Sequence, residues 1–209
     1  MRLATAILLV VATAGGARSE VIDRIVATVG RQVITESEIR KQTRITQFLN
    51  DADVDPGPAE LRKTTDRLVE QELLRQEMTA SRFPMPGLVE AQRALEKLKA
   101  ESFKSAEEYQ SALTRYGIRE EELKEALLWQ IAILRFCEFR FSADLLVSSR
   151  DVEDYYNKKF RDDQAPKLDA VRQSIERILI SERANQSLDQ WLKEARGKTR
   201  VEIRQESFR

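Results

Sequence analysis

The chain has 209 residues, in which 35 lysines and arginines balance 35 aspartates and glutamates, with no histidine and a single cysteine, Cys137. This balance gives the chain no general attraction to nucleic acid or to an anionic membrane surface. One cysteine excludes an internal disulfide, so side-chain packing has to supply the stability.

Residues 1–19 have the pattern of a secretory signal peptide. Arg2 precedes an apolar run over residues 3–14, and small residues lead up to Ser19, after which we expect cleavage. An uncleaved anchor is the alternative, but the run is well short of the roughly 20 residues that a membrane-spanning helix needs. We therefore expect export to the periplasm, no membrane insertion, and one helical domain over residues 20–209.

Residues 22–34 are expected to form a small β-hairpin at the start of the mature chain. An isolated two-stranded ribbon is only marginally stable in water, so these strands need a further partner elsewhere in the sequence.

Long helical segments follow the hairpin, rich in residues that lose little side-chain entropy on entering a helix. Capping-box patterns, Thr35 with Glu38 and Ser105 with Glu108, predict two of the helix starts. Gly197 is expected to end the last helix. The expected helices cover residues 35–50, 59–81, 88–101, 105–116, 119–141, 150–160 and 167–196.

The segment over residues 119–141 is the most apolar of these helices, and its second half reads ALLWQIAILRFCEFRF. Gly117, just before it, suits the left-handed conformation that ends the preceding helix. Apolar side chains lie on nearly every side, which predicts burial at the centre of the helical assembly. Arg135 and Glu138 exclude a membrane span. The helix could also complete its burial in a second copy, which leaves a homodimer open.

The tail over residues 199–204 alternates Thr, Arg, Val, Glu and Ile, the only other convincing strand pattern in the chain. We predict that this tail pairs with the hairpin over residues 22–34. The segment over residues 167–204 would then pack back on the N-terminal part, and both ends of the mature chain would close one small sheet.

Three segments, taken in order behind an export signal, resemble one family. They are VIDRIVATVGRQVITESEI, SSRDVEDYYNKKF and SIERILISERANQSLDQWLKEARGKTRVEI. Together they resemble the SurA-type periplasmic chaperones and their relatives among parvulin-domain foldases, over essentially the whole mature chain. The resemblance implies a mostly helical chaperone core with a small β-sheet, which binds unfolded outer-membrane β-barrel precursors.

The chain departs from that family where a parvulin domain usually stands. One or two prolyl isomerase domains, each of about 100 residues, usually follow the segment that resembles DVEDYYNKKF, but only residues 161–166 stand there. Parvulin active sites are built around histidines, which this chain lacks. We therefore expect no enzyme, no cofactor and no metal site. Cys137 is expected to be a small buried apolar residue rather than a nucleophile.

Binding of extended chains requires a partly apolar, concave surface. Flexible thioethers and a ring around the proline-broken connection after residue 81 could line such a groove, although most aromatic side chains are expected in the core. The peptide-binding candidates are Met78, Phe83, Met85, Tyr116, Trp129 and Phe136.

These features predict an ATP-independent holdase for unfolded outer-membrane or secreted polypeptides. A non-catalytic adaptor that binds one folded envelope partner is the first alternative. A foldase is the second alternative, which the missing histidines and the missing domain disfavour.

Overall fold

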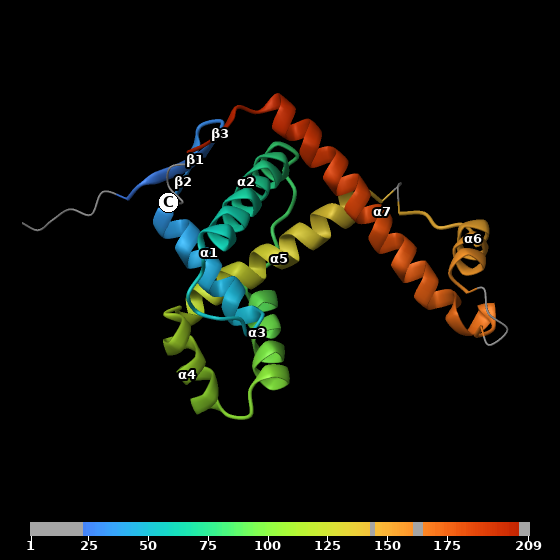
Figure 1. Ribbon diagram of the computed structural model, residues 1–209, viewed down its shortest axis with the longest axis horizontal. Helices are drawn as coiled ribbons and strands as arrows, with labels where there is room; N and C mark the ends of the chain where they lie inside the picture. The colour runs from blue at the N-terminus through green and yellow to red at the C-terminus, as the bar shows by residue number, and fades with distance from the viewer. Residues whose placement is uncertain (1–22, 143–144, 161–164, 205–209) are drawn as a thin grey trace, which may run out of the picture.

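The computed structural model describes residues 23–142, 145–160 and 165–204, so the expected signal peptide lies outside the described residues. The described residues form seven helices and one three-stranded antiparallel sheet (Figure 1). The expectation of a mostly helical protein with a small sheet is confirmed.

The sheet joins the two ends of the described chain. Strands β1 (Ile25–Val29) and β2 (Gln32–Thr35) form the expected hairpin, and β3 (Val201–Ile203) pairs antiparallel with the free edge of β1. The strand order is therefore β2-β1-β3. The predicted pairing of the C-terminal tail with the hairpin is confirmed.

Backbone hydrogen bonds extend the pairing of β3 beyond the strand itself. The amide of Gly30 donates to the carbonyl of Arg200, and the amide of Arg204 donates to the carbonyl of Val26, both at 2.8 Å. Gly30 has φ 61°, a conformation that glycine adopts without steric cost. The turn of the hairpin thus takes part in closing the sheet.

The helix boundaries agree with the sequence pattern to within a few residues. The structure has α1 (Glu36–Leu49), α2 (Pro58–Ala80), α3 (Leu88–Ser102), α4 (Ala106–Tyr116), α5 (Glu120–Arg140), α6 (Ser149–Lys159) and α7 (Leu168–Lys198). Thr35 and Ser105 accept the amides of Glu38 and Glu108 as N-caps, and Gly117 ends α4 in the left-handed conformation. These caps explain why the local predictions succeed.

The prediction that Gly197 ends the last helix is wrong. Helix α7 continues through Gly197 to Lys198, and Thr199 is its C-cap in an extended conformation. The amide of Thr199 still donates to the carbonyl of Ala195, so no left-handed residue is needed there. The chain then passes directly into β3.

The helices pack in two apolar clusters. The first core combines the sheet with α2, Phe136 of α5 and Leu192 of α7. The second core lies between α1, α3, α4 and the first half of α5, and its buried members are Ile45, Phe48, Leu95, Tyr109, Leu113, Tyr116, Ile118, Leu123 and Leu127. Helix α5 contributes to both cores and so connects them.

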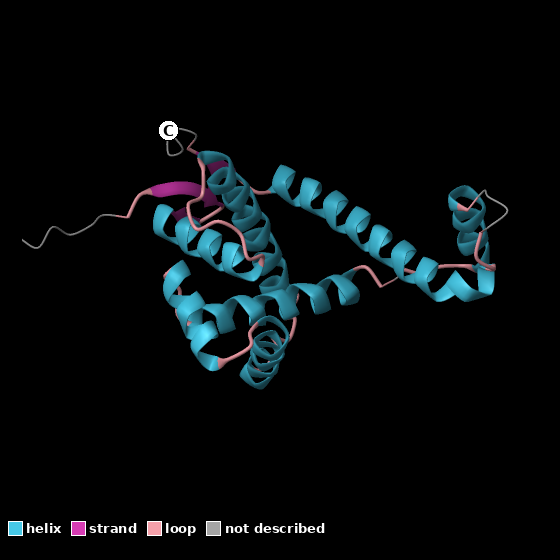
Figure 2. Ribbon diagram, turned by 60° about the horizontal axis from the view of Figure 1, so that its bottom comes forward, coloured by secondary structure: helices cyan, strands magenta, loops and turns pink. Residues whose placement is uncertain are grey.

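Helix α7 leaves the body of the molecule. It runs from the sheet past the C-terminal end of α5, and its N-terminal half extends away together with α6 (Figures 1 and 2). Val152 of α6 and Ile175 of α7 are buried within this helix pair. The pair therefore has only a small apolar core of its own.

The prediction that α5 is buried on all sides is wrong for its second half. Leu123 and Leu127 face the second core and Phe136 faces the first core, but Leu134 is 61% exposed and Phe139 is 65% exposed. The second half of α5 extends away from α4 (Figure 1), and its side chains at Leu134 and Phe139 are left uncovered.

Helices α3 and α5 are also joined by an ion pair. Lys99 Nζ lies 2.6 Å from Glu120 Oε2, and Lys124 Nζ lies 3.0 Å from the other carboxylate oxygen. The hydrogen bond from Lys99 lowers the pKa of Glu120 from 4.5 to about 2. Because the folded state holds the deprotonated form, this pair stabilises the fold above pH 4.5 and loses its effect as the pH falls towards 2.

Pairing of β3 should contribute measurably to stability. Val201 packs against the first core, so Val201→Asp is expected to lower the free energy of unfolding in urea by about 2 kcal/mol, because it places a carboxylate among apolar side chains. Glu202→Thr, at the exposed neighbouring position, is the control and should change it by less than about 0.5 kcal/mol. Equal unfolding midpoints for both variants would show that β3 adds nothing to the core.

Acid should weaken the contact between α3 and α5. Glu120→Gln is expected to reduce the free energy of unfolding by about 1 kcal/mol at pH 7 and to flatten its decline as the pH falls from 4.5 towards 2. Glu101→Gln is the control, because its pair with Lys97 is largely exposed. If the stability of the Glu120 variant fell with acid as steeply as that of the wild type, the ion pair would not be responsible.

Candidate functional site

A cleft opens between the last turns of α2, the loop over residues 81–87 and the middle of α5. It has a volume of about 350 Å³ and is lined by Arg75, Met78, Thr79, Phe83, Met85, Glu125, Leu128 and Trp129. Such a volume lies at the low end of the range of about 300–1,000 Å³ found for ligand pockets. The cleft can therefore hold side chains of an extended chain, but not a folded domain.

The sequence around residue 82 shapes one wall of the cleft. Helix α2 ends at Ala80 with Ser81 as its C-cap, and Arg82 follows at φ 54°, while the amide of Phe83 donates to the carbonyl of Met78 at 2.8 Å. This bond is the 6→1 hydrogen bond of a Schellman motif, which is frequently accompanied by an apolar contact between the same two residues. Pro84 and Pro86 then prevent a return to helix. Both Met78 and Phe83 consequently line the same cleft.

Aromatic rings support this wall from behind. The ring centroid of Phe83 lies 5.3 Å from that of Phe136 in an edge-to-face arrangement, and 5.6 Å from that of Phe139. Phe136 is fully buried in the first core. The cleft is thus built directly on the core that the sheet completes.

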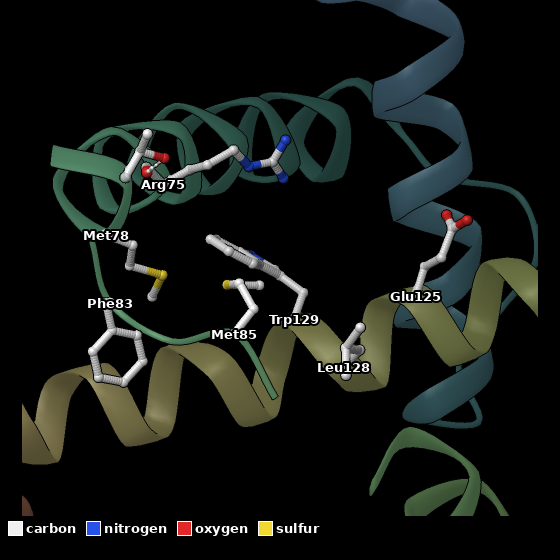
Figure 3. A pocket seen from close by; sticks show the side chains of 8 residues that line it. Arg75, Met78, Phe83, Met85, Glu125, Leu128 and Trp129 are labelled. Atoms are coloured by element: carbon white, nitrogen blue, oxygen red, sulfur yellow. Dashed lines mark hydrogen bonds between the residues drawn. The ribbon is translucent and has the colours of Figure 1, made fainter. Parts of the chain in front are cut away.

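Trp129 forms the opposite wall. Figure 3 shows its indole reaching from α5 towards α2, with the thioethers of Met78 and Met85 beside it. The guanidinium carbon of Arg75 lies 4.9 Å from the centre of the indole ring, within the range of a cation–π contact. The buried indole nitrogen has no hydrogen-bond partner among the described residues. A donor is therefore left over at the wall of an apolar cleft.

The rim of the cleft carries charges of both signs. Arg75 and Glu125 are exposed at its border, and the hydroxyl of Thr79 donates to the backbone carbonyl of Arg75 at 2.8 Å. Met85 projects from the loop and is 53% exposed. The site therefore combines an apolar interior with an electrically balanced border.

The structure brings together four of the six candidate residues, Met78, Phe83, Met85 and Trp129. The other two, Phe136 and Tyr116, do not line this cleft. Phe136 supports Phe83 from the core and offers no surface to a ligand. Tyr116 is buried in the second core, where its hydroxyl donates to the carbonyl of Ala52 at 2.8 Å.

Sequence reasoning missed four residues of the lining, Arg75, Thr79, Glu125 and Leu128. Helical spacing gives a signal for two of them, because Arg75 precedes the candidate Met78 by three residues and Glu125 precedes the candidate Trp129 by four. The burial of Tyr116 and Phe136 has no comparable signal, since an aromatic residue on an apolar helix can face either a core or a groove.

Groups with reactive chemistry are few in the described part of the chain. Cys137 is half-buried on α5, and burial raises the pKa of its thiol, which disfavours the reactive thiolate. Among residues 23–142, 145–160 and 165–204, no cluster of three or more cysteine, aspartate or glutamate side chains could hold a metal ion. None of the helices in these ranges is long and apolar enough to span a membrane.

A comparison with models of known protein families gives no match, and a search of curated proteins gives none either. The resemblance to SurA-type chaperones therefore stays an interpretation of the three sequence segments.

Proposed function

We propose that this protein is an ATP-independent periplasmic holdase that binds unfolded outer-membrane or secreted polypeptides. The observation that carries the proposal is the cleft in which the thioethers of Met78 and Met85 meet the indole of Trp129. Unbranched thioethers adapt to differently shaped apolar partners, and they are common at surfaces that bind many sequences.

Exposed apolar side chains extend this surface beyond the cleft. Leu88 and Val89, at the start of α3, directly follow the loop that carries Met85, and both are largely exposed. Contiguous exposed apolar groups on a protein surface commonly mark an interaction site. An extended client could therefore place one side chain in the cleft and rest neighbouring side chains on this strip.

The size of the cleft favours weak, reversible binding. Burying one large apolar side chain contributes about 1.5–3 kcal/mol, whereas association costs at least about 4 kcal/mol in lost freedom of motion. Several contacts are then needed to hold a client, and each can be released separately. Such binding suits a protein that holds unfolded chains without ATP.

The balanced charge at the rim also fits a broad range of clients. Arg75 and Glu125 place one cation and one anion at the border, so clients are not selected by net charge at this point. Selection then depends on exposed apolar side chains, which unfolded chains present and folded proteins largely bury.

An aggregation assay tests the proposal. A urea-denatured outer-membrane β-barrel protein is diluted into buffer with the mature chain over residues 20–209, and light scattering is recorded. Stoichiometric wild-type protein is expected to suppress the scattering. Met85→Glu should require several-fold more protein, because it places a charge at the mouth of the cleft without disturbing the core.

Val33→Glu is the matched control, since Val33 is about as exposed as Met85 but lies on the hairpin. It should suppress scattering as well as the wild type does. If wild-type protein failed to suppress aggregation, the proposal of a holdase would be wrong. Capture of a single stoichiometric folded envelope protein would then favour an adaptor. Equal activity of Met85→Glu and wild type would show that clients bind elsewhere.

A further inference from the structure

A second cavity adjoins the apolar cleft. It has a volume of about 280 Å³ and lies between α1, α2 and α5. Arg75, Glu125 and Trp129 line both cavities, so the two are neighbours. Unlike the cleft, this second cavity is lined mainly by polar and charged side chains. We call it the polar cavity.

Arg67 of α2 is the most unusual residue of the polar cavity. It is half-buried, and its Nη2 donates to Thr46 Oγ1 at 2.8 Å and to Thr64 Oγ1 at 3.4 Å. Within the described part of the chain, no carboxylate lies within 4.0 Å of its guanidinium. Arginine is rarely withdrawn from water without such a partner.

The loss of hydration around the Arg67 guanidinium also favours binding of an anion beside it. Burial lowers the pKa of its guanidinium, and the charge of Glu60 offsets this effect only in part. A carboxylate bound in the cavity would compensate the lost hydration, because guanidinium and carboxylate form paired, charge-assisted hydrogen bonds.

The surrounding groups also favour an anion. Three basic residues, Lys41, Arg67 and Arg75, and two acidic residues, Glu38 and Glu125, line the polar cavity, which leaves one positive charge in excess. The indole N–H of Trp129 is unpartnered among the described residues. Three glutamine side chains complete the polar lining, Gln42, Gln71 and Gln130.

We propose that the polar cavity binds a carboxylate of a client polypeptide through Arg67, while an apolar side chain of the same client occupies the cleft beside Met78 and Met85. This inference rests on the proposed function and adds a preference among clients. An extended chain advances about 3.3 Å per residue, so the carboxylate would stand within a few residues of the apolar side chain. It can be a terminal carboxylate or that of a glutamate.

Fluorescence of Trp129 provides the test. The chain has two tryptophans, so Trp191→Phe leaves Trp129 as the only tryptophan, whose emission is excited selectively above the absorption of tyrosine. The probes are three short peptides with the same apolar sequence: one with a free C-terminal carboxylate, one with a C-terminal carboxamide, and one carboxamide with a glutamate next to the apolar residues. A carboxylate peptide is expected to bind about tenfold more tightly than the simple carboxamide.

The first and third peptides, each compared with the simple carboxamide, distinguish the two sources of the carboxylate. Tighter binding of the free C-terminus alone indicates a terminal carboxylate, and tighter binding of the glutamate peptide indicates a side chain. Either result supports the inference. Equal affinities of all three peptides, or no binding of any of them, would overturn it. The aggregation assay decides separately whether the protein is a holdase.

Substitutions then assign the preference to Arg67. In the Trp191→Phe background, Arg67→Gln should remove the tenfold preference, and Arg67→Lys should retain part of it because the charge remains. Lys63→Gln, which removes an exposed charge from the same helix, is the control and should keep the preference. A preference that persisted in Arg67→Gln, with the helical circular dichroism unchanged, would contradict the role of Arg67.

Discussion

Pairing of β3 with β1 is the contact on which the rest of the structure depends. It brings the C-terminal end of α7 to the sheet and lets Leu192 enter the first core beside α2. The same core contains Met78, which lines one wall of the cleft, and Phe136, which supports that wall through Phe83. A contact between residues far apart in the sequence therefore positions a surface built from the middle of the chain.

The cleft itself is a consequence of how α2 ends. After α2 the chain turns at Arg82, which has a left-handed conformation, and two prolines prevent the helix from continuing. Met78 and Phe83 are thereby placed beside α5 in the same cleft. Because α5 connects the two cores, its Trp129 is held against this wall and also borders the polar cavity. The apolar cleft and the polar cavity thus share one side chain.

Local features of this fold were predictable from the sequence, and the facing of long apolar helices was not. The caps at Thr35 and Gly117 and the alternating tail depend on short-range chemistry, so these helix boundaries and the closed sheet could be predicted. In the second half of α5 apolar side chains lie on nearly every side, so helical periodicity cannot tell buried Phe136 from exposed Phe139. The surroundings of Arg67 come from three different helices, which leaves no pattern in any single segment.

If the cleft around Trp129 holds apolar segments of unfolded chains, its two methionines allow this binding to be measured directly. Met78 and Met85 are the only methionines in residues 20–209, so carbon-13 labelling of methionine methyl groups gives two signals, both from the cleft. On addition of a denatured outer-membrane protein, both signals are expected to shift, with the larger change at the exposed Met85. If the methyl signals stayed unchanged while the protein kept the client soluble, clients would not bind in this cleft.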